Sequence, residues 1–199
     1  MTGAGGANVP SYCCCVQSER TSKGLSEGRS LLMSLDPELE SIRRRLLRDV
    51  DRVAEALDGL DDEQIAWKPL EQGSSLIVLV THVVGSAQGT VLQLAGEVSL
   101  RDRDTEFLAP WTARSVQGEV AAAKARISAA FERLDPVTLG AKHAAPRISV
   151  GPLTVPAVST LSAGATTARD FLLQTIAHTA EHAGHAELTR DLVRARGTS

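Results

Sequence analysis

Apolar residues recur at intervals of three and four along four separate stretches of the chain, the spacing that places side chains on one face of an α-helix. The first stretch opens with Asp36-Pro37-Glu38, which supplies a capping carboxylate, a proline at the first helical position and an acid in the first turn. The apolar stripe that follows runs to the neighbourhood of Gly59 and consists of Leu39, Ile42, Leu46, Val50, Val53, Leu57 and Leu60. This pattern predicts an amphipathic helix with one buried face.

The second stretch is apolar on most of its surface, which predicts a helix at the centre of the fold. It runs from a cap at Ser74 or Ser75 to about Glu97. Between the first two helices, residues 61–73 are predicted to form a loop. Residues 101–107 are too charged for a core, so we expect a surface connector held by ion pairs of small individual worth.

A third and a fourth helix follow. Ser115 can cap the third, which ends at Pro136 and has the apolar stripe Val116, Val120, Ile127, Phe131 and Leu134. Residues 136–166 are rich in Pro, Gly, Ser and Thr, and the alternation between Ile148 and Val158 allows a short hairpin. Thr167-Ala168-Arg169-Asp170 fits a capping box for a fourth helix that reaches about Val193. Four long helices without a convincing set of strands predict an all-α fold, a four-helix bundle.

Residues 1–33 lack this periodicity and are predicted to be a disordered leader, with Met33 as a candidate for an alternative start, while residues 34–195 form the domain. The leader holds the cysteines, Cys13, Cys14 and Cys15, so no disulfide framework is expected in the domain. It lacks the features of a secretory signal, and no uninterrupted apolar run approaches the ~18 residues that span a bilayer. The net charge of -3 gives no basic surface for nucleic acid. We therefore expect a cytoplasmic protein that binds neither membranes nor nucleic acid.

Three of the five histidines lie on one stripe of the predicted fourth helix, at positions 178, 182 and 185. His178 and His182 are one turn apart, a spacing from which two imidazoles can bind a single metal ion. His82, in the apolar second helix, can supply a third ligand. A ligand set drawn from the fourth helix alone is the alternative, but it would spread over ~10 Å along the helix.

The residues that follow His82 on its own face of the helix are Gly85, Ser86 and Gly89. Their small side chains predict a hollow beside the imidazole, with room for an ion and for a molecule bound to it. Three neutral nitrogens leave at least one coordination position open, as in catalytic sites. Zinc suits imidazole ligands best, while nickel and iron(II) bind them too.

Other polar residues of the fourth helix are candidates for supporting roles. Gln174 and Thr175 lie about one turn before His178 and can orient the ligands. Glu181, three residues after His178, can also orient a ligand, although it equally suits a solvated helix surface. Glu181 and His185 are the candidate catalytic residues, as the general base that a hydrolase would require.

The histidine pattern resembles that of the DinB-like superfamily of metal-binding four-helix bundles, which includes thiol-dependent transferases and isomerases. The matching segments are Val80-Thr81-His82-Val83-Val84-Gly85 and His178-x-x-x-His182-Ala-Gly-His185, and the loop Trp67-Lys68-Pro69 and the connector 101–107 are similar to segments common in that family. The resemblance covers residues 34–195 and implies that His82, His178 and His182 bind a divalent metal ion. His185 stands where many members have glutamine, so the resemblance implies that it lines the pocket.

The resemblance implies a metal-dependent enzyme that transfers a low-molecular-weight thiol to a small electrophile or uses it in an isomerisation. The predicted domain contains no cysteine, so a small-molecule thiol would supply the sulfur. Arginine outnumbers lysine, as in GC-rich genomes, and with the resemblance this favours mycothiol. The alternatives are a non-catalytic metal-binding stress-response module and a small metal-dependent hydrolase that activates water. A homodimer is the assembly we consider.

Overall fold

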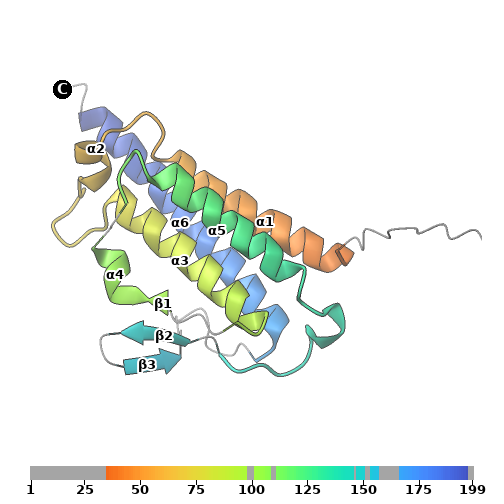
Figure 1. The fold of residues 1–199 in the computed structure, drawn as a ribbon. Coiled ribbons are helices and arrows are strands. Elements are labelled where there is room, and N and C mark those ends of the chain that lie inside the picture. Colours follow the sequence, from red (N-terminus) through yellow and green to blue (C-terminus); the bar gives the residue numbers. More distant parts are fainter. Residues whose placement is uncertain are drawn as a thin grey trace, which may run out of the picture. The chain divides into compact units, whose positions relative to one another are not determined.

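The structure, a computed structural model, describes residues 35–97, 101–108, 111–145, 147–150, 153–156 and 166–196. The predicted leader and its cysteines lie outside the described residues. Four long helices within the described ranges form a bundle (Figure 1): α1 (Pro37–Glu55), α3 (Leu76–Leu94), α5 (Val116–Phe131) and α6 (Ala168–Arg196). The prediction of an all-α fold is confirmed.

The packing of the long helices fixes their order around the bundle. Helices α1 and α3 each contact both α5 and α6, so the order around the bundle is α1, α6, α3, α5. The apolar stripes predicted from the sequence meet in the centre, where the fully buried side chains include Leu39, Leu46, Val80, Ile127, Phe131 and Leu172. Burial of this apolar surface, at roughly 25 cal/mol per Å², is the main term that favours the bundle.

Helix α3 is apolar around most of its circumference. Among the described residues it is the one helix long and apolar enough, by length and composition, to cross a membrane. The helix passes this test on its average hydropathy, although Thr81, His82 and Gln88 interrupt its apolar run, consistent with the lack of a long uninterrupted run in the sequence. Of this apolar window, 67% is buried inside the fold, as expected for the core helix of a bundle.

The predicted helix starts are largely correct. The Asp36 carboxylate accepts hydrogen bonds from the backbone N–H groups of Glu38 and Leu39, at 2.9 and 3.3 Å. The capping box before α6 is present, since Asp170 N–H donates to Thr167 Oγ1 at 3.1 Å and Thr167 N–H donates to Asp170 Oδ2 at 3.0 Å. Ser75 and Ser115 stand at the N-caps of α3 and α5 but make no side-chain cap bond there.

The connectors hold short elements. The predicted loop 61–73 contains α2 (Asp62–Ala66), and the 3₁₀-helix η1 (Pro136–Thr138) follows α5. The hairpin expected between Ile148 and Val158 is present as β2 (Arg147–Val150) paired antiparallel with β3 (Leu153–Pro156).

The charged segment 101–107 is largely exposed, as its composition predicts, but the side chains of Arg101 and Glu106 are turned away from solvent. It forms β1 (Arg101–Asp102), which pairs parallel with β2, and α4 (Arg103–Phe107), which packs against α3. Glu106 is only 6% exposed. A carboxylate can be buried here because a cation is buried with it, and this pair lies against the histidines.

Candidate metal centre

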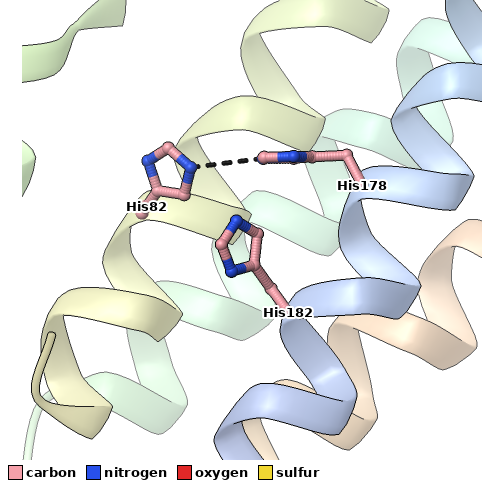
Figure 2. Close-up of side chains that lie close together, drawn as sticks. All are labelled: His82, His178 and His182. Atoms are coloured by element: carbon pink, nitrogen blue, oxygen red, sulfur yellow. Dashed lines mark hydrogen bonds between the residues drawn. The ribbon is translucent and has the colours of Figure 1, made fainter. Parts of the chain in front are cut away.

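Three histidines from two helices converge in the bundle. Figure 2 shows the rings of His82 from α3 and of His178 and His182 from successive turns of α6 pointing toward one another. Each offers a ligand atom, and these atoms all lie within 4.8 Å of one another. His82 Nε2 and His178 Nε2 approach each other to 3.2 Å. The two-helix set predicted from the sequence therefore comes together, with all three side chains half-buried.

The imidazoles of His178 and His182 are held in the neutral form. Burial, followed by the neighbouring histidines and the positive charges of Arg101 and Arg103, lowers the pKa of His178 to about 4. Burial, with His82 and His185, lowers the pKa of His182 to about 4. Both rings therefore keep a lone pair on nitrogen at neutral pH, and a lone pair is what a metal ion requires.

A buried ion pair lies behind His82. The Arg101 guanidinium binds the Glu106 carboxylate through two nitrogens, with Nη2 at 2.7 Å from Oε2, and Nε bonded to Oε1. His82 Nδ1 lies 3.2 Å from Glu106 Oε2 and 3.0 Å from Arg101 Nη2. Burial alone would raise the pKa of Glu106, but the hydrogen bonds and charge of Arg101, together with His82, lower it below its usual value. Glu106 is thus a carboxylate, despite its burial.

The space predicted beside His82 is occupied by this ion pair. A Cβ atom added at Gly85 would overlap Glu106 Oε1, and one added at Gly89 would touch the Arg101 side chain at 3.4 Å. The expectation that Gly85 and Gly89 leave a hollow for an ion and its bound molecule is therefore wrong. Their lack of a side chain instead lets Arg101 and Glu106 pack against α3 and reach the histidine.

The supporting residues predicted on α6 have different surroundings. Gln174 Oε1 is buried and has no hydrogen-bond partner among the described residues. Thr175 donates its hydroxyl to the Phe171 carbonyl at 2.7 Å, so its proton is not directed at a histidine. Glu181 and His185 are exposed. The His185 ring stacks 6.3 Å from that of His182, just outside the triad.

The donor set fits a divalent cation. Two nitrogens bound to one tetrahedral ion at ~2.0–2.1 Å stand roughly 3.3 Å apart. The distance between His82 Nε2 and His178 Nε2, 3.2 Å, matches this separation, and small side-chain rotations can close the other pairs, which lie within 4.8 Å. The triad is positioned for metal binding.

A four-helix bundle with a histidine triad between two of its helices defines the class of protein. The family model described as mycothiol S-transferase matches residues 41–195, and the chain belongs to this DinB-like family. A search of curated proteins and a search of solved structures each found no match. Membership supports a function of the thiol-transferase type, with a small-molecule thiol as substrate.

Proposed function

We propose that this protein is a metal-dependent S-transferase in which His82, His178 and His182 bind a divalent ion, with zinc as the first candidate. The observation that carries the proposal is the triad itself. Its ligand atoms gather within 4.8 Å, and burial keeps His178 and His182 unprotonated. Three protein ligands leave a position for a substrate atom, which a closed structural site would not.

The sulfur comes from the substrate in this proposal. The cysteines of the sequence are Cys13, Cys14 and Cys15, and they precede the residues that the family model matches. A divalent ion at the triad would hold the sulfur of a small thiol as thiolate, the nucleophilic form. Mycothiol is the thiol we propose, because the family is described by it. The cytoplasm, where thiols are kept reduced, is the compartment we propose.

A residue beside the triad would accept the S–H proton of the thiol. The thiol loses its S–H proton to the imidazole of His185, which is exposed and stacks beside His182. The sulfur lone pair then forms a bond to an electrophilic carbon of the second substrate, whose leaving group departs with the electrons of the bond that breaks. His185 returns the proton to water.

The first test is metal content followed by turnover. The purified full chain is analysed for zinc, nickel and iron, and thiol consumption is measured with a panel of electrophiles after the identified metal is restored. We expect turnover with mycothiol that a chelator abolishes, and slower turnover with glutathione. Metal without thiol consumption would favour the non-catalytic module, and turnover of esters or amides without thiol would favour the hydrolase.

The ligand assignment is tested by single substitutions. His82→Ala, His178→Ala and His182→Ala should each weaken zinc binding severely, since each removes a third of the nitrogen ligands. His185→Gln should keep its zinc and slow turnover, because water must then take the proton of the thiol. His143→Ala is the matched control, because that histidine is exposed and bonds the Ala144 carbonyl. Zinc retained by His82→Ala and lost by His185→Gln would contradict the two-helix site.

A further inference from the structure

One ring nitrogen of His82 points away from the triad. Nε2 faces His178, whereas Nδ1 faces the buried pair of Arg101 and Glu106. A neutral imidazole carries one proton, on either Nδ1 or Nε2, and only the nitrogen without the proton can bind a metal ion. The side chain that forms a hydrogen bond with Nδ1 therefore decides which nitrogen carries the proton, and so whether His82 can act as a ligand through Nε2.

We propose that Glu106 is a positioning residue that accepts a hydrogen bond from the Nδ1–H group of His82. The bond keeps the proton of His82 on Nδ1, so that Nε2 faces the metal without a proton. This inference rests on the proposed metal site. The Glu106 Oε2 atom lies 3.2 Å from Nδ1, and the carboxylate can only accept a hydrogen bond. Ligand histidines in metalloproteins commonly donate their second N–H group to a carboxylate in this way.

Arg101 and Gly85 hold the carboxylate in place. Arg101 binds both carboxylate oxygens, which fixes the plane of the Glu106 carboxylate and compensates its charge in a buried position. Gly85 lies one turn beyond His82, and any larger residue there would overlap Glu106 Oε1. Helix α3 thus carries both the histidine and the gap through which the carboxylate reaches it.

A competing arrangement uses the same atoms. Arg101 Nη2 lies 3.0 Å from His82 Nδ1 and could donate to it, in which case the proton of His82 would be on Nε2 and would point at His178. That tautomer cannot bind a metal through Nε2. Arg101 Nη2 carries two hydrogens, and one of them binds Glu106 Oε2 at 2.7 Å in a contact between opposite charges. We assign the Nδ1 proton to His82 because a carboxylate is a stronger acceptor for that N–H group than a neutral ring nitrogen is for the second guanidinium hydrogen.

The first experiment compares Glu106→Gln with Glu187→Gln. The control breaks another two-nitrogen arginine pair, in which Arg52 binds Glu187 with both bonds at 3.0 Å, far along the sequence from α4. Zinc affinity is measured on the full chain by competition with a chromophoric chelator. We expect Glu106→Gln to weaken zinc binding by ~10–100-fold and Glu187→Gln to leave it within about twofold. Zinc affinity in Glu106→Gln equal to that of the control would show that Glu106 is only structural, and it would overturn the proposal.

The second experiment reads the position of the proton directly, and its deciding measurement is made on the natural sequence. Long-range ¹H–¹⁵N NMR of metal-free, histidine-labelled protein reports which nitrogen of His82 is protonated. We expect Nδ1–H in the natural sequence and a shift toward Nε2–H in Glu106→Gln, where Arg101 loses its carboxylate. Nε2–H in the natural sequence would overturn the proposal. If the protein binds no metal at all, the proposed function fails, and this measurement still decides the role of Glu106.

Discussion

His178 and His182 determine how the metal-free protein responds to acid. Their pKa values are about 4 in the folded chain, because burial disfavours the protonated form, and about 6.5 in an unfolded chain. Between these values the unfolded chain binds more protons, so acid favours unfolding. We predict that the free energy of unfolding is unaffected by these two groups above pH 6.5 and falls as the pH drops from about 6.5 to about 4.

Urea unfolding of metal-free protein at a series of pH values measures this loss. The matched variant carries His178→Asn and His182→Asn, which remove the two titrating rings, and it should lose most of the pH dependence in that window. The pKa of Glu106 is also shifted, but downward from its usual value of 4.5, so the loss of stability that its protonation causes appears in more acidic solution. If the free energy of unfolding changed equally with pH in both proteins, the two rings would be protonated as readily in the folded chain as in the unfolded chain.

The histidines were predictable from the sequence because helix periodicity places them. His178 and His182 share a face by their spacing, and a histidine at position 82 in an apolar helix needs a partner. Glu106 was not predictable, since charge along a short connector is typical of surface. Only the packing of α4 against α3 shows that Gly85 leaves space for it. The glycines were a correct signal of close approach, but the group that approaches is a carboxylate.

At the scale of a helix, two glycines should respond oppositely to alanine. Gly184 lies exposed within α6, and a Cβ there would meet nothing within 4 Å. Gly184→Ala should raise the free energy of unfolding by ~0.5–1 kcal/mol, since alanine costs less backbone entropy in a helix. Gly85→Ala should lower it and also weaken zinc binding, because the new methyl group displaces Glu106. Denaturant unfolding and zinc titration of both variants measure the difference, and stabilisation by Gly85→Ala would contradict the packing described for α4.

The long helices were predictable and the short ones were mostly not. A long helix repeats its apolar spacing over several turns, as α1 does with Leu39, Ile42 and Leu46. Helix α2 spans five residues and has no stripe to detect. Its sequence signal was the capping box of Asp61 and Gln64, which the structure contains. Helix α4 has a similar signal in the Asp102 cap, whose carboxylate accepts from the Asp104 N–H at 3.0 Å.

For the molecule as a whole, a metal at the triad would join α3 to α6, and its removal should lower stability without unfolding the bundle. Binding to the native state alone stabilises by roughly 2.7 kcal/mol at 100 times the Kd. For a chain of this length that corresponds to a Tm about 5–10 °C higher. We predict that a chelator lowers the Tm by this amount while the far-ultraviolet circular dichroism keeps its helical form, because the apolar stripes remain buried. The same Tm with and without chelator, after proven removal of the metal, would argue against a bridging ion.

The apolar surface of α3 has a consequence for synthesis. Helices α5 and α6 both cover α3, and α6 is made last. About 100 residues separate the end of α3 from the end of α6, which at ~5–20 residues per second is roughly 5–20 s of translation. During that interval the apolar face of α3 that α6 covers in the folded chain has no partner, although α1 and then α5 are already made. We therefore expect products that stop before α6 to aggregate or to be degraded more readily than the full chain.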